Sequence, residues 1–463
     1  MNEKIDLNNI MNDVQQLINS KLVATIYLKG ISPWWGGDYE SKTSDHVDEH
    51  QIAGKLRWFL KTVYNRFCAS DLTSYEEAEA FVSRFLGSTE GTSNYSFKVK
   101  DEKFSQSGVY FGLNRYKFVS LNKKDKNNYL PRDVVKMKLE IYRHNNTQYD
   151  KIIVEATLIT LAYLGIGRGA NRGFGRFVPE NCNVKTGNSV CQKILYGDVL
   201  GAFNEFYSDF NKLNGCQKNN SWENSYVPVA SDFNKKPLSY TECKTNNIVS
   251  ILNCIQASVM KSTLKQLSFK ISLKDPGPFI HTWIYGLPRQ SKKEIIETTY
   301  SPGQSNKQQK KQKIMLGYVK NKEYEELRRQ SMFVISPVVK NGRYFVCVLP
   351  FLSLLDNQDA LNDLYHVGIH QNEPNKPHKV KILEVIQGIN NLYPYEKTLA
   401  SKNKDLSYGN GNLTNLINKY HSELVKNLNY CCNNPNSFFQ NKSYLGNPGN
   451  LRSQSYFDGG KKI

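Results

Sequence analysis

The spacing of apolar residues in the first 180 positions predicts strands and helices in alternation. Residues 52–67 carry the clearest pattern, because their apolar side chains recur at helical spacing on one face. β-Branched and aromatic side chains indicate a strand at residues 21–29. By the same criteria we expect further strands at 94–100, 134–143 and 173–178, and an apolar helix at 151–164. The resulting order, βαββαβ, is that of a ferredoxin-like fold in the α+β class.

The second half of the chain gives fewer clear signals. Residues 332–352 form two β-rich runs around Asn341 and Gly342, the dipeptide most typical of a tight hairpin. Residues 181–240 are polar and rich in Asn, so we interpret them as a connection. The exception within them is a helix predicted at 195–213. Further along, the pattern predicts a strand at 264–273, a mobile Gln- and Lys-rich loop at 301–313, a helix at 380–392 and a loosely held tail from 433.

Residues 165–176, called the glycine–arginine loop below, hold five glycines and three arginines. Glycine lets a backbone approach a ligand without a Cβ in the way, and arginine offers a planar, permanently charged fork that suits phosphate. The loop lacks the spacing of a P-loop and of a dinucleotide-binding turn, and it follows a helix instead of opening one. This combination favours a polyanion over a nucleotide cofactor.

The predicted helix at 52–67 has a polar face opposite its apolar one. Gly54, Arg57, Lys61 and Asn65 gather there, with Trp58 beside them. An ordinary solvated surface and a face that follows a phosphate backbone are both compatible with these residues. Gly54 favours the second interpretation, because glycine inside a helix costs about 1 kcal/mol and usually has a contact reason.

The segment before that helix contains two tryptophans beside two glycines, Gly36 and Gly37. Trp34 and Trp35 either stack on bases or fix the loop to the core, and the sequence favours neither. The polar loop that follows holds Asp45, His46, Asp48 and His50. Such a cluster suits acid–base chemistry, but a hydrophilic loop without a special role explains it more simply. We predict no metal site, since no third ligand motif accompanies the cluster.

Composition narrows the class of partner. The 463 residues include 61 Lys and Arg against 42 Asp and Glu, a formal net charge of +19. This excess favours nucleic acid or an acidic protein surface over small metabolites. No apolar run is long enough to span a membrane, and no signal peptide is apparent. The nine scattered cysteines form no CxxC pair and are odd in number, so we expect a reducing setting without a disulfide framework.

These features together resemble one family. The chain is similar to the repeat-associated mysterious proteins (RAMPs) of type III CRISPR effector complexes, and among them to the first subunit of the type III-B Cmr complex. The segments that carry the resemblance are 32–37, 52–60, 86–91, the glycine–arginine loop, 286–289 and 328–331. Leu86 in place of an aromatic residue, and Met332 in place of a proline, depart from the family pattern.

The resemblance implies two ferredoxin-like (RRM-like) RAMP domains with helical and loop insertions. It divides the chain into an N-terminal helical segment (1–20), a first RAMP domain (21–195), a helical and polar connection (196–260), a second RAMP-like domain (261–432) and a tail (433–463). It also implies a cytoplasmic, antiviral RNA-binding subunit that caps the filament. Its partners would be crRNA, target RNA and other Cmr subunits, both the RAMP backbone and the large subunit. It would use no cofactor, have no catalytic centre and make no membrane contact.

The predicted site combines both lines of reasoning. We expect RNA contacts from Lys55, Arg57, Trp58, Lys61, Arg168, Asn171, Arg172, Arg176, Arg289, Arg328 and Arg329. We expect close backbone approach at Gly36, Gly37, Gly54, Gly165, Gly167, Gly169, Gly173 and Gly175. Two alternatives stay open: an endoribonuclease that uses Asp45, Asp48, His46 or His50 on target or precursor RNA, and a scaffold whose charge complements acidic neighbours.

Overall fold

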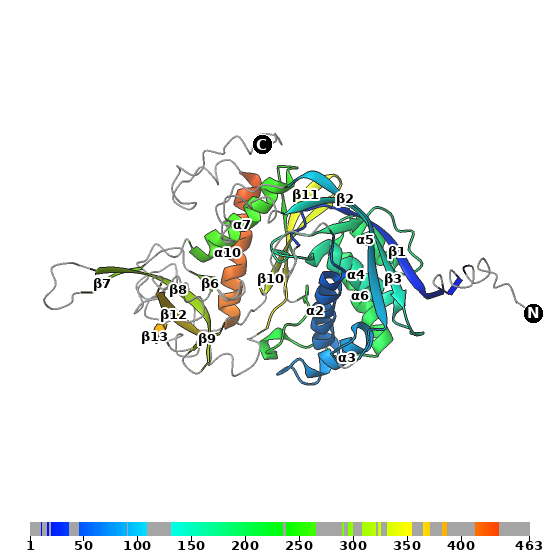
Figure 1. Cartoon of the computed structure of the whole chain (residues 1–463), viewed down its shortest axis with the longest axis horizontal. Helices are drawn as coiled ribbons and strands as arrows, with labels where there is room; N and C mark the ends of the chain where they lie inside the picture. Colours follow the sequence, from blue (N-terminus) through cyan, green and yellow to red (C-terminus); the bar gives the residue numbers. More distant parts are fainter. Residues whose placement is uncertain are drawn as a thin grey trace, which may run out of the picture.

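The computed structural model describes most of the first half of the chain and selected elements of the second half (Figure 1). The described residues are 11, 16–17, 20–36, 46–89, 91–108, 131–234, 238–264, 289–290, 295–299, 308–320, 323–325, 331–353, 364–370, 382–386 and 413–434.

The first half forms a four-stranded antiparallel sheet with the order β2-β3-β1-β4. Its strands are β1 (Leu22–Gly30), β2 (Tyr95–Gly108), β3 (Arg132–Arg143) and β4 (Phe177–Pro179). The elements follow one another as strand, helix, two strands, helix and strand, with one added helix, α3 (Glu76–Leu86). The predicted βαββαβ order is therefore confirmed for this half.

Helices cover one face of this sheet (Figure 1). α2 (Glu49–Phe67) begins at Asp48, whose carboxylate accepts a hydrogen bond from the backbone N–H of His50 at 2.9 Å. α4 (Asp150–Ile159) continues into a π-helical turn, η3 (Thr160–Leu164), that ends at Gly165. α5 (Asn188–Leu195) and α6 (Val199–Asn214) complete the layer. The apolar faces of these helices and the inward side chains of the strands form one continuous core.

A second sheet, with the order β10-β11-β5, packs against this core. β10 (Phe333–Lys340) and β11 (Arg343–Pro350) form the hairpin predicted around Asn341 and Gly342, and both of these turn residues have positive φ. β10 is almost wholly buried. The third strand, β5 (Ser239–Glu242), pairs with β11. Helices α7 (Ile248–Leu264) and α10 (Leu413–Asn433) pack on each other and on this sheet.

A third antiparallel sheet lies in the second half and has the order β13-β12-β8-β6. β7 and β9 also pair with β8. The bounds of its strands are β6 (Arg289–Gln290), β7 (Ile295–Thr299), β8 (Gln308–Lys320), β9 (Glu323–Glu325), β12 (Leu364–His370) and β13 (Ile382–Ile386).

Four predictions for the second half need correction or fall outside the described residues. The helix predicted at 380–392 is wrong where it can be compared, because β13 occupies 382–386 and pairs with β12. Its run of Ile, Leu and Val is compatible with a helix or a strand, and the pairing with β12 makes it a strand. The loop predicted at 301–313 is wrong from Gln308 onward, where β8 begins. The strand predicted at 264–273 is wrong at Leu264, which ends α7, and its other residues lie outside the described residues. The tail predicted from 433 begins one residue too early, because α10 ends at Asn433, and the residues beyond 434 lie outside the described residues.

The helix predicted at 195–213 is present as α6, which contributes Phe203, Phe206 and Phe210 to the core. The interpretation of the rest of 181–240 as a connection misses α5 and the start of β5, which begins at Ser239 and joins the second sheet. A strand of only four residues gives too short a pattern to be recognised in a polar context, so its pairing with β11 could be seen only in the tertiary structure.

The expectation of no disulfide framework is wrong. Disulfides join Cys68 to Cys216, Cys182 to Cys191 and Cys254 to Cys431. The last of these connects α7 to α10. Two of the pairs are separated by 148 and 177 residues, so their cysteines meet only because the chain folds back on itself. An odd number of cysteines does not exclude any of these disulfides, and the spacing of the cysteines along the sequence did not reveal which of them pair.

Among the described helices, none has the length and apolar composition that a bilayer span requires. This agrees with the absence of a long apolar run in the sequence.

We predict that Phe59→Ala lowers the free energy of unfolding by about 3–5 kcal/mol. Phe59 is fully buried, and its ring packs against Phe203 and Phe206 of α6 and against Phe351 after β11. The substitution would leave a cavity where α2, α6 and the second sheet meet. Urea denaturation followed by circular dichroism measures the change. A loss below about 1 kcal/mol would contradict the packing described here.

Candidate nucleic-acid interface

The glycine–arginine loop lies between the first and second sheets. On one side the Arg168 N–H donates to the carbonyl of Trp35 at 2.6 Å, and the Gly175 N–H donates to the carbonyl of Pro33 at 2.8 Å. On the other side the Ile335 N–H of β10 donates to the carbonyl of Asn171 at 3.0 Å. The loop therefore joins the two sheets through its backbone and has only part of its surface available to a ligand.

Arg176 corrects the prediction that every arginine of the loop contacts RNA. Its side chain is fully buried. Nε donates to Ser336 Oγ at 2.8 Å, Nη1 to the Phe174 carbonyl at 2.6 Å, and Nη2 to the carbonyls of Ala170 and Ile335 at 2.7 and 3.2 Å. Burial lowers the pKa of this guanidinium to about 9. Because all of these donors are already used inside the protein, Arg176 is a structural residue and not a phosphate ligand.

The glycines of the loop also need correction. Five of them have positive φ, as the sequence suggested, namely Gly165, Gly167, Gly169, Gly173 and Gly175. The atoms that approach them, however, belong to the protein. A Cβ on Gly165 would overlap the Arg176 guanidinium, and one on Gly175 would overlap the Ile166 carbonyl. Gly36 is crowded in the same way by the indole of Trp34. Their freedom from a Cβ serves internal packing.

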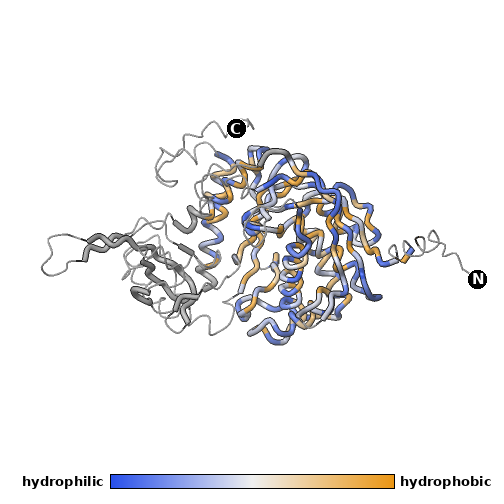
Figure 2. The backbone as a smooth tube through the Cα atoms, in the orientation of Figure 1, coloured by the Kyte–Doolittle hydropathy of each residue, from blue (hydrophilic) through white to orange (hydrophobic). Residues whose placement is uncertain are grey.

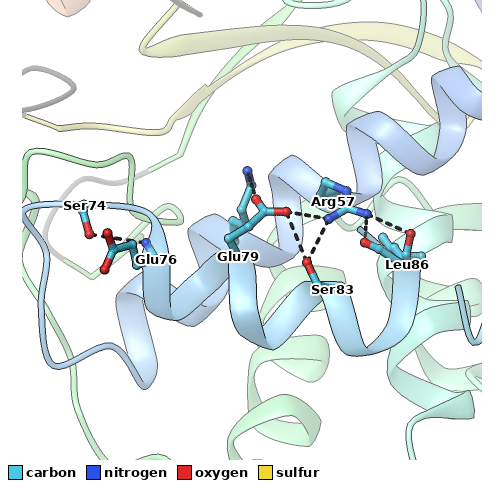
Figure 3. A network of polar contacts seen from close by, with 8 residues as sticks. Arg57, Ser74, Glu76, Glu79, Ser83 and Leu86 are labelled. Carbon is cyan, nitrogen blue, oxygen red and sulfur yellow. Dashed lines mark hydrogen bonds and ion pairs between the residues drawn. The ribbon is translucent and has the colours of Figure 1, made fainter. Parts of the chain in front are cut away.

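The polar face of α2 packs against α3, which the sequence analysis missed (Figure 3). Arg57 Nη1 donates to Glu79 Oε1 at 2.6 Å, and its Nη2 donates to the carbonyls of Leu86 and Gly87 at the end of α3. Lys61 Nζ lies 2.8 Å from the other oxygen of Glu79. Arg57 and Lys61 are therefore engaged with α3, and the prediction that they line an RNA groove is not supported by this arrangement.

Asn65 lies on the same side of α2 but is buried. Its Nδ2 donates to the Pro228 carbonyl at 3.0 Å.

The position of α3 against α2 has a signal in the sequence. It is the segment 76–86, in which three acidic residues precede an apolar helical face. A partner helix with an acidic first turn is a sufficient reason for cations on α2.

Lys55 of α2 is linked to the loop through Asn171. We call Lys55 and the predicted loop residues Arg168, Asn171 and Arg172 the loop rim. All four are half-buried. Lys55 Nζ donates to Asn171 Oδ1 at 3.1 Å, which links residues 116 positions apart. Arg172 Nη1 reaches Gln256 Oε1 of α7 at 3.3 Å. Gly54 lies next to this group, and space around it is open.

Lys55 has an unusual electrostatic environment. Its ammonium lies 4.2 Å from the centroid of the Trp58 ring. Burial, and then the positive charge of Arg176, lower the pKa of Lys55 to about 7. The amine is therefore only partly protonated near neutral pH. An arriving phosphate would favour the charged form, because an opposite charge raises the pKa of an ammonium group.

The tryptophans differ in how far they are buried. Trp34 is fully buried, and its Nε1 donates to Gln51 Oε1 at 3.1 Å, so it fixes the segment to the core. Trp35 is half-buried, and its backbone bridges to Gly167. Trp58 is half-buried, with its ring centroid 4.8 Å from that of Phe351. Trp34 cannot stack on a base in this arrangement.

The Asp and His candidates of the alternative enzyme are placed as follows. Asp48 caps α2, and His46 lies 2.6 Å from Glu102 and 3.2 Å from Glu49. The hydrogen bond that the His46 ring donates to the Glu102 carboxylate is the main cause of the raised pKa of His46, which burial partly opposes. His50 is exposed at the start of α2, and Asp45 lies outside the described residues. Within the part of the chain that the structure describes, no group of three potential ligands is placed to hold a metal ion.

The remaining candidates cannot be placed by their side chains. Arg289 is in β6, where only the backbone is described. Gly37, Arg328 and Arg329 lie outside the described residues. Their predicted contacts with RNA stay predictions.

One sequence match covers most of the four-stranded sheet, together with α2 and the glycine–arginine loop. Residues 27–178 match the RAMP superfamily. This confirms the resemblance predicted from the sequence and covers β1 through β4. No curated protein sequence matches the chain significantly.

Two solved structures are similar to the chain, though distantly. A cryo-EM structure of the type III-B Cmr-beta complex with cognate target RNA and AMPPnP, in the presence of ssDNA, matches at 13% identity and a TM-score of 0.48. The match covers 89% of this chain and 100% of the matched chain in that structure. Cmr1 from Pyrococcus furiosus matches at 13% identity and a TM-score of 0.44, over 71% of this chain and 88% of that one. At these scores the structural likeness carries no argument about function.

We predict that Arg176→Ala lowers the free energy of unfolding by about 2 kcal/mol or more, because it removes four charge-assisted hydrogen bonds and leaves a cavity. Arg168→Ala, at a half-exposed position of the same loop, should change it by less than about 1 kcal/mol. Chemical denaturation compares the two variants. A fully stable Arg176→Ala variant with weakened RNA binding would restore Arg176 as a ligand residue.

Proposed function

We propose that this chain is a non-catalytic RNA-binding subunit of a type III CRISPR effector complex, in which it caps the crRNA-bearing filament. The match of residues 27–178 to the RAMP superfamily carries the proposal. The net charge of +19 supports it, because a basic surplus of this size suits a phosphate polymer.

The loop rim supplies the contact surface. Lys55 of α2 donates to Asn171 of the loop, and Arg168 and Arg172 are half-buried basic residues of the same loop. Contacts of this kind fix a strand through its phosphates and carry no base code. Sequence choice would then come from pairing between guide and target. In this proposal the buried glycines and Arg176 hold the rim in place and do not touch the strand.

The partners and location follow from the same proposal. RNA would be present as crRNA and target RNA, and the protein neighbours would be other Cmr subunits, the RAMP backbone and the large subunit. A second RAMP-like domain within 261–432 is part of the proposal. A cytoplasmic location now rests on this function alone, because the three disulfides remove the argument from scattered cysteines.

The endoribonuclease alternative has less support. His46 and Asp48, two of its four candidates, have evident structural contacts in an ion pair and a helix cap. The exposed His50 has no acidic or basic partner among the described contacts that would orient it for proton transfer.

We predict that Arg168→Ala and Arg172→Ala each weaken binding of single-stranded RNA. Each should reduce the slope of log K against log salt by about 0.7, the value for one lost phosphate contact on a single strand. Fluorescence anisotropy of a labelled RNA, repeated across salt concentrations, measures both quantities.

Arg84→Ala is the matched control, since Arg84 is exposed on α3 and the substitution removes the same charge. If all three variants lose affinity equally, only net charge matters and the loop rim is not a site. Specific cleavage of the RNA probe, seen on a denaturing gel and lost in His50→Ala, would overturn the non-catalytic part of the proposal.

We predict that RNA affinity falls as pH rises from about 6.5 to 8.5. The pKa of Lys55 is about 7 in the free protein, so the positive charge that meets the phosphate is lost over this range. Lys55→Arg should flatten this dependence, because arginine stays protonated throughout. Identical pH profiles for the two proteins would show that Lys55 does not contact the RNA.

A further inference from the structure

The face of the first sheet that points away from the helices is basic and aromatic. Along β1, Ala24, Ile26 and Leu28 are buried towards the helices, while Tyr27 and Lys29 are exposed on the opposite face. Figure 2 shows this alternation of hydrophobic and hydrophilic positions along the strands. In an antiparallel sheet, residues paired across strands point to the same side. The register therefore shows which side chains share the outer face.

Three rows of residues cross that face. Tyr27 pairs with Lys138, and Lys138 pairs with Lys100. The neighbouring rows pair Thr25 with Glu140 and Glu140 with Lys98, and Lys29 with Lys136. We call the set Tyr27, Lys29, Lys98, Lys100, Lys136, Lys138 and Tyr142 the outer sheet face. Tyr142 belongs to it because it lies two positions after Glu140 on β3.

Two of the described carboxylates at this face, Glu140 and Glu180, are paired with lysines. Glu140 lies 2.7 Å from Lys100 and 2.6 Å from Lys138. Although burial opposes it, hydrogen bonds from these lysines and Tyr142 lower the pKa of Glu140 to about 2. Glu180 lies 3.2 Å from Lys136. Among the described residues, Lys29 and Lys98 have no acidic partner, so the face keeps a positive surplus.

The two tyrosines offer flat rings within this positive field. The Tyr27 side chain is 46% exposed. Tyr142 is half-buried, its hydroxyl donates to Glu140 at 2.6 Å, and Lys98 lies 5.6 Å from the centroid of its ring. Tyr142 lies four positions along β3 from Lys138, the partner of Tyr27, which separates the two rings by about 13 Å along the strand direction. A single strand of nucleic acid crosses such a distance within a few nucleotides.

We propose that the outer sheet face binds single-stranded RNA, with Tyr27 and Tyr142 stacking on bases and Lys29 and Lys98 contacting phosphates. Four-stranded sheets with exposed aromatic side chains suit this task, because bases splayed out from a strand stack on rings that stand on a sheet. The site is separate from the loop rim in sequence and uses different residues. It rests on the proposed RNA-binding function but on none of the residues of the rim.

The balance of charge and ring exposure favours RNA over a protein partner. An acidic protein would suit the lysines, but it would not require exposed rings with cations beside them. The face also lacks the contiguous apolar core that stable protein interfaces bury, because its exposed positions are mainly lysines. A strand of RNA uses both features at once.

The test uses the full chain and a labelled single-stranded RNA that contains 4-thiouridine. Fluorescence anisotropy measures the affinity, and ultraviolet crosslinking then maps the residues that contact the RNA. Tyr27→Ala should weaken binding about tenfold, and Tyr27→Phe should leave it within about twofold, since stacking needs the ring and not the hydroxyl. Lys29→Glu with Lys98→Glu should weaken binding and reduce the salt slope by about 1.4. The matched control is Lys185→Glu with Lys212→Glu, which makes the same charge change at two exposed positions away from the strands.

Each outcome decides the inference. Crosslinks on β1 or β3, together with losses in Tyr27→Ala and in the Lys29/Lys98 variant only, support it. Loss in the control variant to the same degree, or no loss in Tyr27→Ala, overturns it. Unchanged RNA affinity with loss of binding to an isolated protein subunit of the complex also overturns it, in favour of a protein interface.

The same titrations with the double variant Arg168→Ala/Arg172→Ala distinguish the outer sheet face from the loop rim. If that variant binds normally while the sheet variants fail, the loop rim is wrong and the outer sheet face stands.

Discussion

The buried guanidinium of Arg176 holds together the parts of this protein that the structure describes best. It lies where the glycine–arginine loop meets β10, and its hydrogen bonds reach Ser336 and the carbonyl of Ile335 as well as two carbonyls of its own loop. A charge removed from water is tolerated only when acceptors surround it. The path of the loop, the glycine at 165 and the position of β10 are therefore mutually dependent.

This dependence changes what the loop can do. The glycines were expected to expose backbone to a ligand, but the nearest atoms belong to the protein itself. The loop instead acts as a rigid joint, and its function is confined to the rim where Lys55, Arg168, Asn171 and Arg172 remain partly accessible. Rigidity suits such a site, since basic side chains held on a fixed backbone lose less entropy when they meet a phosphate.

The first sheet separates two environments. Its inner face is filled by α2, α4 and α6, and their burial leaves the helices little freedom to reach a strand of RNA. Cations on α2 are consumed in the same layer, because Arg57 and Lys61 meet Glu79 of α3. The outer face lies opposite the helix layer, and lysines and tyrosines are concentrated there. The surplus of positive charge along the chain is thus divided unequally between the two sides of one sheet.

The sequence by itself determined the order of elements in the first half, the β10–β11 hairpin and the resemblance of residues 27–178 to the RAMP superfamily, because these depend on local periodicity, on Asn341-Gly342 and on short motifs. It did not determine which cations stay at the surface. Arg57, Arg168 and Arg176 are the same residue type in sequence surroundings rich in glycine or charge. Only the tertiary structure shows that Arg57 forms an ion pair, that Arg168 is partly accessible at the loop rim and that Arg176 is buried between the loop and β10. The strand at β5, the identity of β13 and the disulfides were decided in the same way. Burial and pairing depend on what arrives from distant parts of the chain, and no local pattern records that.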